Sequence, residues 1–291
     1  MNFNKYCEDE YIDHTVYSRL ANLESNEERK NILLKLAAQE KEHLQFWSSL
    51  GGRYSNNFMT KVRINLIIFL RYLFGLTFAI KFMERNERRV ISEYKKALEK
   101  LEGENRINLE RIIYDEVEHE NYWISQIKER AVTYIGFIIL GLADAIIEIT
   151  GVHAGFLGVT ASTIVAGIAG LVVGISASIA MASAAYLQAQ QGSLGNPRLS
   201  AIYTGFSYIM TAVALATPYF LTHIMLLAFT LSLIVALALL AFFNFYSAVI
   251  SDREFIRDYL FNSGLILLTA FVSFFFGTFL GEYFGITGIF H

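Results

Sequence analysis

The chain has 291 residues, a net charge of −3 and a single cysteine, and 54% of its residues are hydrophobic. The small negative charge, without any lysine- and arginine-rich tract, excludes a nucleic-acid partner. Cys7 alone cannot form an intramolecular disulfide, or a cysteine cage for zinc or an iron–sulfur cluster. Because the first residues are polar and acidic, with no apolar signal-peptide core, we expect the first domain to be cytosolic.

Charged residues are concentrated near the N-terminus. Of the 24 basic and 27 acidic side chains, only nine follow Ala131. Such a break in composition marks a domain boundary and a second half that is buried or faces lipid. We therefore predict an all-α chain with a soluble domain over residues 1–130 and a membrane domain over residues 131–291.

The first domain is predicted to be a bundle of four helices. Apolar residues recur at helical spacing in four segments, approximately residues 5–23, 25–51, 80–101 and 104–130. Ser25 followed by Glu28 forms a capping box, which predicts the start of the second helix. Four such helices within one domain favour a four-helix bundle.

The segment between the second and third predicted helices is unusual for a soluble domain. Residues 64–82 are nearly all apolar and could just span a bilayer. Arg71 near the middle opposes insertion by roughly 2.5–3.5 kcal/mol. We therefore interpret the segment as the long crossover connection of the bundle, lying against the membrane surface or a partner subunit.

Five apolar segments of the second domain are each long enough to cross the hydrocarbon core. They cover approximately residues 132–151, 163–189, 201–220, 224–250 and 259–283. If the N-terminus is inside, the arginines of the connections fall on the inner side: Arg130, Arg198, Arg253 and Arg257. The outer side has only His153, His223, Glu282 and His291. This positive-inside pattern predicts a multi-pass cell-membrane protein with a cytosolic N-terminus and an external C-terminus.

Two Glu-x-x-His motifs, Glu40/His43 and Glu116/His119, lie on the second and fourth predicted helices. Residues three apart share a helix face. The other two helices can complete a site for two divalent cations with Glu10, Glu84 and Glu87. Carboxylates neutralise the cations, and imidazoles add neutral nitrogen donors, which suits iron or manganese.

The alternative interpretation places both motifs on solvated charged faces. A single Glu-x-x-His motif would favour it, because both residue types are common on exposed helices. His43 and His119, however, each precede an inward-facing tryptophan by four positions, at Trp47 and Trp123. Two motifs, with a glutamate available on each of the other helices, favour the metal site.

Asp144 and Glu148 lie four residues apart in the first predicted span, on one helix face. No lysine or arginine lies within a span to neutralise them, so each must be protonated, hydrated or bound to a cation. Charged residues at membrane depth mark ion pathways by default. Met181 in the second span offers a thioether ligand, although an isolated methionine is more often a packing residue.

Several stretches of the first domain match one known pattern: Glu10, Tyr17-Ser18-Arg19-Leu20-Ala21, Glu40-Lys41-Glu42-His43, Glu84-Arg85-Asn86-Glu87 and Asp115-Glu116-Val117-Glu118-His119. They resemble the ferritin-like domain of rubrerythrins. The resemblance implies a di-metal site whose ligands are Glu10, Glu40, His43, Glu87, Glu116 and His119, with Glu84 as an extra carboxylate. The paired-cysteine rubredoxin module of full rubrerythrins is absent, which argues against peroxide reduction fed by that module.

The membrane domain carries a second set of matching stretches: Gly141-Leu142-Ala143-Asp144-Ala145, residues 178–187, Asn196-Pro197, Tyr203-Thr204-Gly205 and Thr217-Pro218-Tyr219. They resemble the vacuolar iron transporter family, some members of which carry an N-terminal ferritin-like domain. The resemblance implies a homodimer that moves Fe²⁺ or Mn²⁺ out of the cytosol by proton antiport, with Asp144 on the path and Met181 nearby. Ala185 replaces a glutamate that many members have at this position, and Glu148 could compensate.

We therefore predict a transporter that exports Fe²⁺ or Mn²⁺, with a di-metal bundle that captures or oxidises the ion. The alternatives are a membrane-anchored di-iron oxidase or peroxidase, including a ferroxidase step, and a metal sensor without transport. Five spans with Asp144 and Glu148 inside are more than an anchor needs. The expected partners are metal ions, the lipid bilayer and a second copy of the chain.

Overall fold

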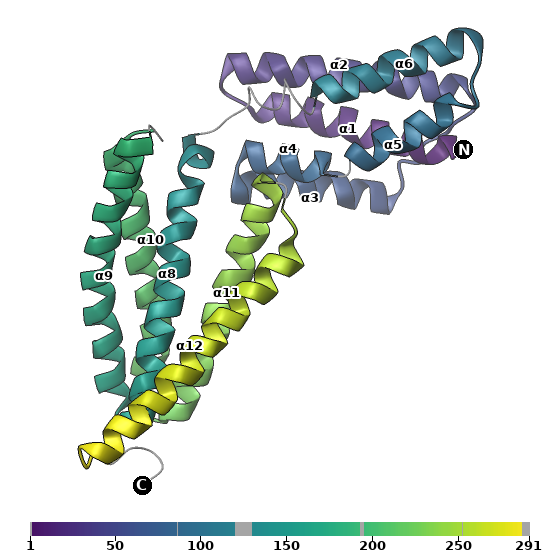
Figure 1. Cartoon of the computed structure of the whole chain (residues 1–291). Helices are drawn as coiled ribbons and strands as arrows, with labels where there is room; N and C mark the ends of the chain where they lie inside the picture. The colour runs from purple at the N-terminus through teal and green to yellow at the C-terminus, as the bar shows by residue number, and fades with distance from the viewer. Residues whose placement is uncertain (1, 86, 120–129, 193–194, 252, 287–291) are drawn as a thin grey trace. The chain divides into compact units, whose positions relative to one another are not determined.

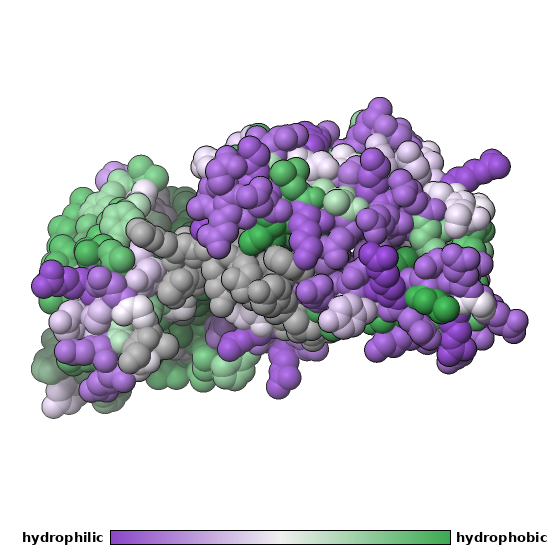
Figure 2. Space-filling view, turned by 90° about the horizontal axis from the view of Figure 1, so that it is seen from above, coloured by the Kyte–Doolittle hydropathy of each residue, from purple (hydrophilic) through white to green (hydrophobic). Residues whose placement is uncertain are grey.

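The computed structural model describes all residues except 1, 86, 120–129, 193–194, 252 and 287–291. Every regular element in the described ranges is a helix, which confirms the all-α prediction. The chain divides into two compact units, Met1–Glu129 and Arg130–His291 (Figure 1). Figure 2 shows hydrophilic residues over most of the visible face of the first unit, and both hydrophobic and hydrophilic residues on the visible face of the second.

The first unit is built from helices that enclose two apolar cores. Its helices are α1 (Phe3–Leu23), α2 (Glu27–Ser49), α3 (Phe58–Phe74), α4 (Leu76–Glu84), α5 (Glu87–Leu98) and α6 (Gly103–Glu118). One core joins α1 and α2 to α3 and α4, around Leu20, Leu36 and Ile80. The other joins α1 and α2 to α5 and α6, around Trp47 and Leu109. The α1–α2 pair is therefore the common wall of both cores.

Two details of the sequence prediction are wrong at helix boundaries. Asn26, not Ser25, caps α2, because its side chain accepts a hydrogen bond from the Arg29 amide at 3.0 Å. The apolar segment 64–82 is not one connection, because Gly75 adopts φ 93° and separates α3 from α4. The third predicted helix therefore corresponds to two helices: α4, which begins at Leu76, and α5, which begins at Glu87.

Five helices of the second unit are long and apolar enough to cross a membrane, which indicates a multi-pass membrane protein. They are α8 (Arg130–Val159), α9 (Thr163–Gly192), α10 (Pro197–Leu221), α11 (Met225–Ile250) and α12 (Phe255–Tyr283). The five predicted spans are confirmed. α8 lies at the centre of this unit, because it packs against each of the other four helices.

The predicted end of the first span at Gly151 is wrong, since α8 continues to Val159. The glycines of this last part, Gly151, Gly155 and Gly158, lie against α12 rather than in a loop. A Cβ atom on Gly158 would lie 2.6 Å from the Thr278 amide nitrogen and 2.7 Å from the Phe274 carbonyl oxygen. These glycines let two helix backbones approach closely.

We predict that Gly158→Ala weakens the packing of α8 on α12. The added methyl group has no space there, so overpacking should cost about 1–3 kcal/mol of unfolding free energy. Thermal unfolding of the detergent-solubilised chain measures this as a lower midpoint. Gly136→Ala is the matched control, because a Cβ atom at Gly136 of α8 meets no other described atom within 4 Å. Equal midpoints for both variants would contradict the close approach.

Candidate metal centre

Three helices of the first unit direct acidic and imidazole side chains into one buried cluster. α1 supplies Glu10, α2 supplies Glu40 and His43, and α6 supplies Glu116. One ligand atom from each of these four residues lies within 4.8 Å of all the others, and all four side chains are buried. The three-residue spacing of Glu40 and His43 places both on the inner face of α2.

His43 lies at the centre of the cluster. Its Nδ1 atom is 3.6 Å from Glu10 Oε2, 3.3 Å from Glu40 Oε2 and 3.0 Å from Glu116 Oε1. On the other side of the ring, Nε2 is 3.5 Å from the Asp115 carboxylate. Asp115 therefore orients the imidazole, so that Nδ1 faces the three glutamates.

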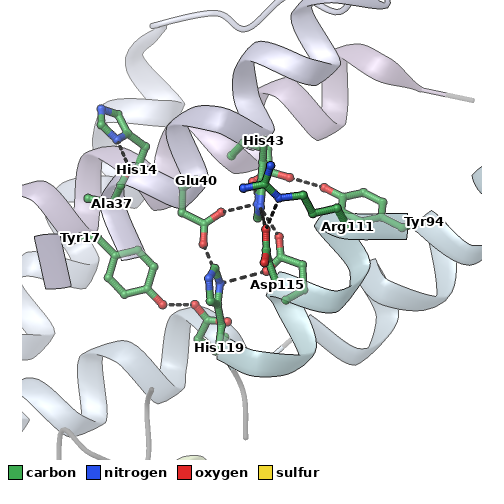
Figure 3. A network of polar contacts seen from close by, with 12 residues as sticks. His14, Tyr17, Ala37, Glu40, His43, Tyr94, Arg111, Asp115 and His119 are labelled. Atoms are coloured by element: carbon green, nitrogen blue, oxygen red, sulfur yellow. Dashed lines mark hydrogen bonds and ion pairs between the residues drawn. The ribbon is translucent and has the colours of Figure 1, made fainter. Parts of the chain in front are cut away.

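His119 enters the same cluster from the end of α6. Its Nδ1 atom is 3.1 Å from Glu40 Oε1 and 3.3 Å from Glu116 Oε2, and its side chain is fully buried. Figure 3 shows the His43 and His119 rings each contacting a different oxygen of Glu40. Glu40 and Glu116 each face both histidines, so both carboxylates would be available to a metal ion held by either imidazole.

The buried charged groups of the cluster strongly shift one another's pKa values. Burial alone would raise the pKa of Glu40, but the His119 and His43 imidazoles beside it hold that pKa far below its usual value. Burial opposes protonation of the imidazoles, yet Glu116 and Glu40 raise the pKa of His119 to about 10. Glu116 and Asp115 likewise raise the pKa of His43 well above its ordinary value. Without metal, the two histidines therefore carry the positive charge at neutral pH.

Two tyrosine hydroxyls donate hydrogen bonds to carboxylates in or beside the cluster. The Tyr94 hydroxyl on α5 donates to Glu10 Oε1 at 2.5 Å, and the Tyr17 hydroxyl on α1 donates to Glu84 Oε1. Burial and the neighbouring Glu40 raise the pKa of Glu84 to about 8. The second oxygen of Glu84 is buried without a hydrogen-bond partner among the described residues. The side chain of the predicted ligand Glu87 lies outside the described residues, so its role stays a prediction.

Sequence reasoning missed two acidic residues of this region. Asp13 follows Glu10 by one helical turn, and burial together with the charges of Glu40 and Glu84 raises its pKa well above the ordinary value. It also lines a cavity of about 360 Å³ between α1, α3, α4 and the start of α5. Asp115 is the other. Three-residue spacing from Glu10 was a signal for Asp13, but nothing in the sequence distinguishes Asp115 from an exposed carboxylate.

The donor set fits a divalent metal. The ring nitrogens of His43 and His119 lie 3.0–3.6 Å from carboxylate oxygens, yet none makes a hydrogen bond within the described part of the chain. Buried polar atoms rarely lack hydrogen bonds in this way. Imidazole nitrogens together with the carboxylates of Glu10, Glu40 and Glu116 suit a divalent metal ion, and the absence of thiolates at the cluster disfavours softer ions. When bound, the metal would add Lewis-acid or redox chemistry.

The predicted residues of the membrane unit are only partly brought together. Asp144 and Glu148 share one face of α8, and the Tyr208 hydroxyl of α10 donates to the Glu148 carboxylate. Met181 lies on a different helix, α9, and is partly buried. Ala185 is fully buried against Tyr134 and its neighbours, so an apolar contact occupies this position.

The predicted position of His153 is wrong. It was expected in an external connection, but it is a fully buried residue of α8. Its ring lies 4.1 Å from that of Tyr219 on α10, and a side chain on Gly170 of α9 would collide with it. In the described part of the chain, neither its ring nitrogens nor the Tyr219 hydroxyl has a hydrogen-bond partner. The unit thus contains a buried polar pair beyond Asp144 and Glu148.

No protein family, curated protein or solved structure matches the chain. The chemistry of the two groups of polar residues therefore carries the functional argument.

We predict that Glu40→Gln removes most Mn²⁺ binding from the full chain, because the variant loses a carboxylate that faces both histidines through separate oxygens. The apparent affinity should fall by more than the roughly 10–100-fold that loss of an outer partner costs. Calorimetric titration measures the change. Glu42→Gln, an exposed glutamate on the same helix, should bind as the parent does. Equal affinity of the two variants would contradict the centre.

Metal binding is also expected to release protons. His119 and His43 are protonated in the metal-free cluster because their pKa values are raised, and a metal ion accepts only the neutral ring. Apparent affinity should therefore rise across about pH 6 to 8, approaching tenfold per pH unit for each proton released. Titration in two buffers of different ionisation enthalpy counts these protons. A pH-independent affinity would show that the histidines are not ligands.

Proposed function

We propose that the protein is a membrane transporter for Fe²⁺ or Mn²⁺ that captures the ion in the buried cluster of the first unit. The single observation that carries this proposal is the presence of two metal-suited acidic groups in one chain. One is the Glu10, Glu40, His43 and Glu116 cluster. The other is the pair of carboxylates on α8, a helix long and apolar enough to cross a membrane.

The chemistry of the α8 carboxylates supports transport. An ionised carboxylate at membrane depth is costly unless it is hydrated, protonated or bound to a cation. Glu148 has a hydrogen bond from Tyr208, whereas Asp144 is available for an exchange of a proton for a metal ion. His153 adds a buried imidazole further along α8. Export from the cytosol by proton antiport is the form of transport we propose.

The sequence resemblances support the same proposal for each unit. The first unit would be a ferritin-like domain of the rubrerythrin type, with Glu84 and Glu87 completing a di-metal site. The second would belong to the vacuolar iron transporter family and act as a homodimer, with Met181 near the path. The cytosolic side of the membrane for the N-terminus and the external side for the C-terminus are part of this proposal.

A membrane-anchored oxidase is the weaker candidate. It would explain the buried cluster, including a ferroxidase step on bound iron. It would leave the intramembrane Asp144 and Glu148 without a role, although buried charges are retained only at a cost. Transport gives both groups of residues a function.

We predict that vesicles containing the protein accumulate Mn²⁺ when a proton gradient is imposed, and that Asp144→Asn abolishes this uptake. The amide keeps the size of the side chain but cannot exchange a proton for a cation. A metal-sensitive dye inside the vesicles measures the rate, which should fall to that of protein-free vesicles.

Glu254→Gln is the control, because it neutralises an exposed carboxylate between α11 and α12. It should transport as the parent does. The Asp144→Asn variant should also keep the Mn²⁺ content of its bundle, which shows that it is folded. Uptake by Asp144→Asn at the parent rate would overturn the proposed path, and no uptake by the parent would overturn transport itself.

A further inference from the structure

Helix α3 has two opposite apolar faces. Its inner face packs into the first core through Ile64, Ile67 and Ile68. Its outer face consists of large apolar side chains that are exposed: Phe58, Val62, Leu66, Phe69 and Leu73. The spacing of four, four, three and four residues aligns them in a single stripe along the helix.

The outer face differs from the rest of the surface of the first unit. Phe58 is 78% exposed and Phe69 is 59% exposed, and both lie in the same stripe. Other exposed apolar residues of this unit, such as Ile107 and Leu34, belong to separate helices. Scattered residues of that kind are normal, whereas a continuous apolar stripe marks an interaction surface.

Basic residues border the outer face on both sides. Lys61 and Arg63 are exposed, and their positions on the helix lie on either flank of the stripe. Arg63 is 3.4 Å from Asp9, and its side chain remains more than half exposed. α3 contains no aspartate or glutamate. Aromatic and aliphatic side chains flanked by Lys and Arg are the composition of helices that lie in a membrane interface.

We propose that α3 is an interfacial helix that inserts its outer face into the membrane surface, with anionic lipid headgroups at Lys61 and Arg63. The occupant follows from two observations. The same chain continues into five helices suited to cross a bilayer, so the stripe is covalently tethered to lipid at high effective concentration. A second copy is disfavoured, because a two-fold contact between two α3 helices would oppose like charges with no acidic partner on the helix.

The contact would orient the metal centre relative to the bilayer. α1 and α2, which carry Glu10, Glu40 and His43, pack on the inner face of α3. A helix fixed at the interface therefore holds the capture site at the membrane surface. This consequence does not depend on which ion is bound or on whether it is transported.

The test uses the full chain in nanodiscs, with Cys7→Ala to remove the buried native thiol. A fluorophore is placed on Phe69→Cys of the outer face or on Ile107→Cys, a matched control that is 66% exposed on α6. Nitroxide groups on lipid acyl chains should quench the Phe69 label severalfold more than the Ile107 label. Iodide in the water should quench the two labels in the reverse order.

Three results would overturn the proposal. Equal quenching of both labels by the lipid nitroxide would place α3 in water. Protection of the Phe69 label from both quenchers would mean that protein covers the stripe. Lipid quenching that appears only with two or more copies per nanodisc would assign the surface to a second copy.

A separate double variant tests the role of the basic residues Lys61 and Arg63. Lys61→Glu with Arg63→Glu should lower lipid quenching at Phe69 severalfold in phosphatidylglycerol nanodiscs, and less in phosphatidylcholine. Lys41→Glu with Lys100→Glu, two exposed lysines away from α3, should leave it unchanged. Bound Mn²⁺ confirms that each variant is folded. Equal quenching in all variants and lipids would overturn the role of the basic flanks.

Discussion

Glu10, Glu40 and Glu116 are buried side by side, and carboxylates so placed must be neutralised or protonated. His43 and His119 supply the positive charge in the metal-free cluster, since the glutamates hold both imidazoles protonated. Any metal that enters must displace those protons. The same constraint explains the tyrosine hydroxyls on Glu10 and Glu84, which satisfy carboxylate oxygens that water does not reach.

The helical framework makes this burial of charge tolerable. α1 and α2 contribute to both apolar cores, one on each side of the charged cluster along their length. Large buried side chains such as Trp47 and Leu36 hold the helices at fixed separations, because protein interiors are close-packed. The packing of these helices therefore brings the ligand atoms of the cluster together.

The second unit also buries polar and acidic side chains, but different groups stabilise them. Glu148 is stabilised by the hydroxyl of Tyr208 from a neighbouring helix, and His153 lies against Tyr219 without a hydrogen bond among the described residues. His153 is fully buried against Tyr219 of α10 and Gly170 of α9, whereas Glu148 lines a cavity of about 480 Å³ between α8 and α12. Unpaired polar atoms in such surroundings are costly, which is why they indicate function rather than packing.

The sequence by itself determined the helical class, the five membrane helices and the cluster of Glu40, His43, Glu116 and His119, because hydrophobic periodicity and three-residue spacing are local properties. Only the tertiary structure decided the rest. Asp115 faces His43, and Asp13 lies near Glu40 and Glu84, because of which helix faces meet. His153 is buried because α8 continues past Gly151 and because Gly170 of α9 leaves space for the imidazole ring. From the sequence alone, a glycine or an acidic residue in a loop cannot be distinguished from one at a helix contact, because the distinction depends on its neighbours in space.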